Sequence, residues 1–251
     1  MKKINYLFVL GAIIFSACSG QPLFDTDATE SAAGTKQLTL SVTQHGTPDA
    51  DGVYPDLAIA DGTKVFQNDL GVTITLEEAS LSWGHIELIS AGDDEDCGQN
   101  DDLTLHVEST QDLMDDDLAE QTLFDDLVVE AIYCQYQIAL EAASDANAEL
   151  NHTADTGTHT VHLSGHWSDG SATGEFSVSI DDEVTVSNIF YALEDGEIVA
   201  HPLHFHEDSL SYVLGVRYDQ LLDGLDFSES EAEQQAQVIE NLEVAVRQNL
   251  N

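Results

Sequence analysis

Short stretches in which apolar and polar residues alternate are the feature that most constrains how this chain can fold. Leu38, Leu40 and Val42 alternate with threonine and serine, and residues 72–76 repeat the pattern. A period of two with β-branched residues is typical of strands that bury one face. Further strands are expected at 79–90, 103–109, 127–141, 158–164, 174–180, 183–191, 197–206 and 209–218.

Turn signals separate these segments. Asp-Gly pairs stand at 51–52, 61–62, 169–170 and 195–196, and this dipeptide is common in hairpin turns. Roughly ten strands with such turns predict a mostly β fold, an antiparallel β-sandwich or barrel. The acidic stretch 111–126 departs from the alternation, and we expect a loop there with at most a helical turn.

The C-terminal residues predict one α-helix at about 229–249. Ser228 and Ser230 each stand three residues before a glutamate, which is the pattern of a capping box. Apolar residues then follow at spacings of three and four, and form one stripe: Ile239, Leu242, Val246 and Leu250. We expect the helix to cover an open side of the sheet, and a partner-binding helix is the alternative.

The N-terminus has the anatomy of a secretory signal. Lys2 and Lys3 precede an apolar run from 7 to 15, which is too short to cross a bilayer as a helix. The sequence Phe15-Ser16-Ala17-Cys18 resembles the bacterial lipobox, with Phe15 in place of the usual leucine. The resemblance implies that residues 1–17 are a cleaved signal peptide and that Cys18 carries lipid.

The same resemblance bears on localisation. Ser19 after the cysteine implies the outer membrane, with the protein anchored by lipid and facing the periplasm or the cell surface. Residues 18–36 are small and polar, and predict a flexible tether with a reach of roughly 20–25 Å. Residues 37–251 then form a single β-rich domain, for which an outer-membrane protein is an expected partner.

Charge excludes whole classes of partner. The chain has 48 acidic residues against 6 basic ones, a net charge of −42. Loss of Lys2 and Lys3 with the signal would leave 48 acidic against four basic residues, a net charge of −44. Such a chain repels nucleic acid and anionic lipid. Adaptation to a saline medium, diffuse cation binding and a calcium site all remain open as explanations.

The segment Asp93 to Gly98 does not fit an EF-hand. With Gly98 at the sixth position of that loop, the fifth position needs an oxygen ligand. Cys97 stands there instead. Only a looser calcium site is compatible with these residues.

Cysteines and catalytic motifs point to a stabilised, non-enzymatic domain. Besides Cys18, the chain has Cys97 and Cys134, and two cysteines in an exported chain usually form a disulfide. Its loop of about 36 residues would make it worth roughly 3–4 kcal/mol. A nucleophilic cysteine is the alternative, but no motif supports it. No catalytic signature is present, so we expect no enzyme activity.

Histidines are the residues that a salt-adapted surface does not explain, and there are ten. His204 and His206 fall on one face of a strand, about 6.5–7 Å apart, close enough to share one ion. His106 and His162 also occupy strand positions. We therefore predict a transition-metal site for Zn²⁺ or Cu²⁺ with ligands among His204, His206, His106 and His162. Histidines that lie on the surface or pair across strands are the alternative.

Several motifs together resemble a group of exported bacterial lipoproteins without an established activity. They are Ile86-Glu87-Leu88 before Cys97, Leu105-His106-Val107-Glu108-Ser109, Tyr133-Cys134, and residues 221–227 leading into 238–242. The resemblance implies a β-rich lipoprotein associated with metal uptake. The first hypothesis is thus metal capture or delivery. The second is a structural or partner-binding module whose acidity reflects a saline medium.

Overall fold

The computed structural model describes residues 34–49, 53–55, 62–91, 102–142, 159–194, 197–200, 202–204 and 209–248. They belong to one compact unit, residues 33–251. The predicted signal peptide, Cys18, Cys97 and His206 lie outside the described residues, so the predictions that rest on them stay predictions. The first strand begins at Thr35, so the last two residues of the predicted tether are strand instead.

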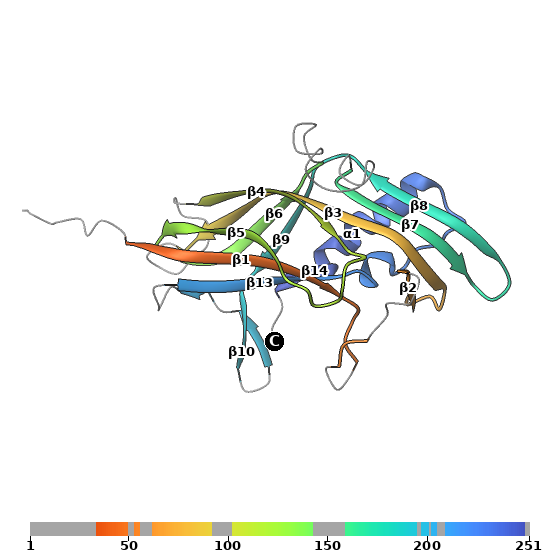
Figure 1. Cartoon of the computed structure of the whole chain (residues 1–251), viewed down its shortest axis with the longest axis horizontal. Helices are drawn as coiled ribbons and strands as arrows, with labels where there is room; N and C mark the ends of the chain where they lie inside the picture. The colour runs from red at the N-terminus through yellow and green to blue at the C-terminus, as the bar shows by residue number, and fades with distance from the viewer. Residues whose placement is uncertain are drawn as a thin grey trace, which may run out of the picture. The chain divides into compact units, whose positions relative to one another are not determined.

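The smaller sheet joins the two ends of the described chain. Its order is β14, β13, β1, β5. The bounds are β1 (Thr35–His45), β5 (Gln121–Val129), β13 (Ser209–Arg217) and β14 (Val246–Gln248). β1 and β13 run parallel, in register from Gln37 with Ser209 to His45 with Arg217, and lie side by side along their length (Figure 1).

The larger sheet is built around one long strand, β3 (Thr73–Ser90). The first part of β3 pairs with β2 (Lys64–Gln67) and β7 (Val161–Ser168), and β7 pairs with β8 (Thr173–Ile180). The second part pairs with β4 (Leu103–Asp112) and β6 (Ile132–Leu140). β6 also pairs with β9 (Val184–Ile189) and β12 (Leu203–His204), while β10 (Tyr191–Glu194) and β11 (Glu197–Ala200) form a separate hairpin.

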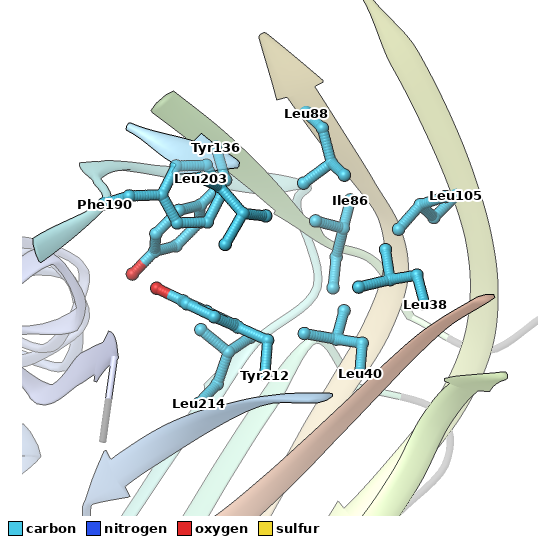
Figure 2. Close-up of a pocket in the computed structure, with 10 residues that line it drawn as sticks. All are labelled: Leu38, Leu40, Ile86, Leu88, Leu105, Tyr136, Phe190, Leu203, Tyr212 and Leu214. Carbon is cyan, nitrogen blue, oxygen red and sulfur yellow. The ribbon is translucent and has the colours of Figure 1, made fainter. Parts of the chain in front are cut away.

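The two sheets enclose a single apolar core. Leu38 and Leu40 of β1 point from the smaller sheet toward Ile86 and Leu88 of β3 in the larger one (Figure 2). Alternate residues are buried in β8 and β9, as a half-buried strand requires, whereas β1 and β3 also have runs of consecutive buried residues. The predicted mostly β, sandwich-like fold with a C-terminal helix is confirmed.

Helix α1 (Glu231–Ala245) closes part of this core. Ser230 and Glu233 form the predicted capping box, because each side chain bonds the other's backbone N–H. The helix buries Val238, Leu242 and Ala245 and contacts β8, β9, β13 and β14.

The end of the helix and its buried face differ from the prediction. The helix stops at Ala245, and residues 246–248 pair with β13 as strand β14. The Asn188 side chain donates to the Val246 carbonyl, and Gln248 accepts the Tyr191 N–H. These partners outside the helix hold the segment extended. Ile239, expected in the buried stripe, is 39% exposed, because the stripe is centred on Val238 instead.

The predicted loop at 111–126 is wrong at both ends. Gln111 and Asp112 are the last two residues of β4, and the Gln111 amide donates to Gln44 while its oxygen accepts the Trp83 indole N–H. Residues 121–129 form β5, in which Asp125 accepts hydrogen bonds of 2.8 Å from Gln37 and from Thr39 of β1. These cross-strand hydrogen bonds stabilise a strand in a segment whose acidic composition had favoured a loop.

Within the described ranges, no helix is long and apolar enough to cross a membrane.

Candidate functional site

Four histidines of the described part lie against carboxylates. His85 Nδ1 is 2.9 Å from Glu141, and His159 Nδ1 is 2.5 Å from Asp181. His162 Nε2 and His166 Nε2 are each 3.3 Å from a glutamate of β3, Glu78 and Glu77 respectively. A carboxylate that accepts from one ring nitrogen fixes the orientation of the imidazole.

A bulge in β3 makes the two glutamate contacts of β7 compatible. The register between β3 and β7 shifts between Leu76 and Glu78, and Glu77 and Glu78 are both exposed. In a regular strand, consecutive side chains point to opposite faces. The bulge interrupts this alternation, so that His162 and His166 of β7 each contact one of the two glutamates.

Both ring nitrogens of His162 have hydrogen-bond partners. Its Nε2 contacts Glu78, and its Nδ1 lies 3.0 Å from the Ser179 hydroxyl on β8. The ring stacks on His159 with centroids 5.5 Å apart. Both nitrogens therefore have partners before any ion arrives, and binding a metal would require one of them to be released.

His85 and His106 form a different arrangement at the centre of the large sheet. They are cross-strand neighbours on β3 and β4, and their ring centroids are 6.5 Å apart. His85 is 36% exposed and Glu141 is 41% exposed; His106 is exposed. Two imidazoles and one carboxylate thus lie together at the surface, at the C-terminal end of β6.

Gly84 explains how Glu141 reaches His85. A Cβ at Gly84 would lie 2.7 Å from the carboxyl carbon of Glu141 and 2.9 Å from its Cβ. The whole Glu141 side chain therefore lies across the bare glycine backbone. The bulge between Trp83 and His85 falls at the same place, which sets His85 beside that carboxylate.

This donor set suits a borderline transition ion. Glu141 holds the Nδ1 side of His85, which leaves its Nε2 directed away from that contact. Imidazole nitrogen with carboxylate oxygen is a ligand set for Zn²⁺ or Cu²⁺. No preassembled group of three His, Cys, Asp or Glu ligands occurs in the described ranges, so rotation of the His85 and His106 rings would have to bring the donors onto one ion.

The sequence-predicted ligands fall at separate places on the large sheet. His106 is in register with His85 and His162 with Ser80, five positions apart on β3, which is roughly 17 Å. The backbone of His204 lies in β12, paired with Ile132 of β6, and His206 is outside the described residues. Of the four, only His106 has a second imidazole as its cross-strand neighbour in the described part of the chain.

His85 and Glu141 are the members of this group that the sequence did not single out. His85 is on β3, Glu141 directly follows β6, and His106 is on β4, so the three are far apart in the sequence. The Gly84-His85 pair within an apolar strand was the available signal, because a glycine inside a strand indicates a bulge or a close approach.

A pocket between the sheets is a second candidate. Its side chains come from both sheets and are apolar apart from two phenol hydroxyls (Figure 2): Leu38, Leu40, Ile86, Leu88, Leu105, Tyr136, Phe190, Leu203, Tyr212 and Leu214. The Tyr136 and Tyr212 hydroxyls point toward each other and interact electrostatically, but neither makes a well-formed hydrogen bond in the described structure. Burial raises the pKa of Tyr136 to about 12, so the phenol stays neutral.

A buried polar cluster of Lys64, Asp117 and Tyr218 has a structural role. The Lys64 ammonium, 1% exposed, donates to Asp117 at 2.6 Å and lies 4.4 Å from the centre of the Tyr218 ring. Tyr218 donates its hydroxyl to the same carboxylate, and its pKa is raised, first by burial and then by this bond. Each charge has partners, as buried charges require.

His45 lies near that cluster and is 3% exposed. Its Nδ1 is 2.9 Å from the Gly46 carbonyl oxygen, and its ring meets the edge of Tyr54. Burial lowers the pKa of His45, and the nearby charge of Arg217 adds to this, against the opposing effect of Asp219 and Asp117. A neutral, buried imidazole of this kind is a core residue.

Comparisons with protein-family models, with curated proteins and with solved structures give no match to this chain.

Proposed function

We propose that this protein is a lipid-anchored lipoprotein of the outer membrane that binds a transition-metal ion through histidines, for capture or delivery. The lipobox-like sequence at Cys18 supports the anchor. The observation that carries the metal binding is the His85–His106 pair, with Glu141 held against His85 across Gly84. The proposal moves the favoured site from β12 to the centre of the large sheet.

Electrostatics favour such a role. The net charge of −42 raises the local concentration of cations near the surface. Imidazole ligands give selectivity for transition ions over the sodium, calcium and magnesium that carboxylates attract. Binding needs neutral imidazole, so affinity should fall in acid, where imidazole binds a proton in place of the metal.

A structural or partner-binding module is the second candidate. The observation that favours it is that His159, His162 and His166 are each paired with a carboxylate of a neighbouring segment. Polar cross-strand pairs, such as those of His162 and His166 with glutamates of β3, stabilise sheets by roughly 0.2–1 kcal/mol each. On this reading, the histidines hold an acidic sheet together and need no metal.

The test is titration calorimetry with Zn²⁺ and Cu²⁺ at molar NaCl, which suppresses weak binding to carboxylates. We expect one saturable site in the wild type and its loss in the double variant His85→Ala, His106→Ala. The matched control is His159→Ala, His166→Ala, which removes two carboxylate-paired histidines elsewhere on the sheet and should leave binding intact.

A third double variant, His204→Ala, His206→Ala, separates the two locations. Loss of binding there, with His85 and His106 dispensable, would assign the metal to β12 and the residues after it. Binding that is equal in all three variants and the wild type would overturn histidine ligation, and the structural module would then be the better description.

A further inference from the structure

The His85–His106 pair supplies fewer ligands than a bound metal ion needs. Proteins hold Zn²⁺ with at least three of their own ligands, and with four in structural sites. The pair offers two imidazole nitrogens, and no group of three His, Cys, Asp or Glu ligands occurs in the part of the chain that the structure describes. The remaining ligands therefore have to come from outside this group.

Glu141 does not complete the set. Its carboxylate contacts His85 Nδ1 at 2.9 Å, whereas the nitrogen that is free for a metal is Nε2, on another edge of the ring. A carboxylate in this position orients the imidazole and makes it a better ligand without touching the ion. Each copy of the chain thus presents two nitrogens, one from His85 and one from His106.

The pair lies where a second copy can reach it. Ile86 points into the core (Figure 2), so its neighbour His85 lies on the outer face of the large sheet. His106 is exposed on β4, and so are Thr104 and Glu108, two residues to either side of it. Helix α1 contacts other strands, β8, β9, β13 and β14. The two imidazoles therefore stand at an accessible surface.

We infer that one Zn²⁺ or Cu²⁺ ion joins two copies of this chain, each of which contributes His85 and His106. A two-fold axis through the ion places the same two side chains on both sides of it. Four imidazole nitrogens fill the tetrahedral coordination of Zn²⁺ or the square-planar coordination of Cu²⁺. The partner at the metal site is thus the protein itself, an inference that rests on the proposed function.

Charge makes this association depend on conditions. Two chains with a net charge of −42 each repel one another, and Glu87, Glu108 and Glu141 add to the repulsion near the pair. A divalent ion between the copies reduces it, and molar salt screens it to a length of about 3 Å. We expect the copies to stay apart without metal and to associate with metal most readily at high salt.

The experiment is sedimentation velocity of the full chain with Cys18→Ser, which carries no lipid, in molar NaCl. We expect monomers in EDTA and dimers with Zn²⁺ or Cu²⁺. Titration calorimetry under the same conditions should give one ion for every two chains. Ca²⁺ and Mg²⁺ prefer oxygen ligands and should leave the chain monomeric.

The variant His106→Ala leaves one imidazole in each copy and should abolish the metal-dependent dimer. The matched control is His166→Ala, because it removes another exposed histidine of the same sheet, 50% exposed beside Glu77. This control should form dimers as the wild type does. If His106→Ala fails to fold by circular dichroism, His106→Gln replaces it.

The outcomes separate this inference from the proposed function. One ion per chain on a protein that stays monomeric would overturn the inference and leave the metal site in place. A dimer that forms equally in EDTA, with Ca²⁺ or in His106→Ala would also overturn it, since carboxylates or another surface would then join the copies. If neither Zn²⁺ nor Cu²⁺ binds at all, the proposed function and the inference both fail.

Discussion

The hydroxyls of Tyr136 and Tyr212 illustrate how single polar atoms are placed in this core. Both residues are nearly buried, at 1% and 7% exposure, and both rings contact Phe190 with centroids 5.0 and 5.2 Å apart. The aromatic packing contributes to stability, whereas a buried hydroxyl without a well-formed hydrogen bond costs free energy.

We therefore expect Tyr136→Phe and Tyr212→Phe to be neutral or to raise the melting temperature. The matched control is Tyr133→Phe, since the Tyr133 hydroxyl donates to the Val129 carbonyl at 3.0 Å. That variant should lose about 1 kcal/mol of unfolding free energy. Urea denaturation of the three variants decides the question, and equal losses in all three would contradict the expectation.

The lowered pKa of His45 predicts how the free energy of unfolding depends on pH. Its pKa in the folded state lies below the ordinary value of 6.5, so the unfolded chain binds a proton more readily. The stability that His45 contributes is complete above pH 6.5 and is lost as the pH falls below it toward the folded-state pKa. In His45→Gln, unfolding free energies measured between pH 7 and 5.5 should fall less steeply than in the wild type; parallel curves would count against it.

At the scale of elements, the alternation of apolar residues located most of the strands. It predicted β1, β4, β6, β7, β8, β9 and β13 to within about five residues, because each buries one face, and it divided β3 into two strands at 72–76 and 79–90. It missed β2, β10, β14 and most of β5. The strand conformation of β5 and β14 depends on partners distant in sequence. Asp125 of β5 accepts hydrogen bonds from Thr39 and Gln37 of β1, and these hydrogen bonds lower the pKa of its carboxyl.

The candidate site was less accessible to sequence reasoning than the fold. Histidine spacing finds ligands on one strand, such as His204 and His206, but His85, His106 and Glu141 meet only through the pairing of three strands. The bulge that sets their positions has no marker in the sequence other than Gly84. Register between distant segments is a tertiary property, and local periodicity does not contain it.

Gly165 shows what one residue contributes to a strand pair. Its φ is +156°, and a Cβ there would overlap the Thr75 carbonyl oxygen of β3. We expect Gly165→Ala to separate β7 from β3 and to cost roughly 2–3 kcal/mol.

Gly170, in the turn of the same hairpin, is the control for that substitution. Its φ is +85°, but nothing lies within 4 Å of a Cβ there. Gly170→Ala should cost only the conformational penalty of about 1–2 kcal/mol. Chemical denaturation measures both variants, and a smaller loss for Gly165→Ala than for Gly170→Ala would show that the close approach is not limiting.

At the scale of the whole molecule, charge is the dominant property. Removal of residues 1–17 would leave four basic residues against 48 acidic ones, and one of the four, Lys64, is buried in its ion pair with Asp117. The acidic surface is therefore barely neutralised by the protein itself, and self-repulsion opposes the compact state.

We expect the melting temperature to rise between low and molar NaCl as this repulsion is screened. Sucrose at matched concentrations is the control, because it favours compact states without screening charge. Differential scanning calorimetry in both series separates the effects. A melting temperature that is flat in NaCl would mean that the carboxylates do not limit stability.

The parallel pairing of β1 with β13 has a consequence for how the chain reaches its native state. The two strands are separated by more than 160 residues of sequence, yet they are neighbours in the smaller sheet. A ribosome therefore completes nearly the whole chain before β1 can meet β13. Contacts between residues so far apart in the sequence slow folding, because the chain loses the entropy of loop closure before the contacts that stabilise it can form. A nascent chain that stops before Ser209 leaves one edge of β1 without its partner, and an open strand edge is a template for aggregation.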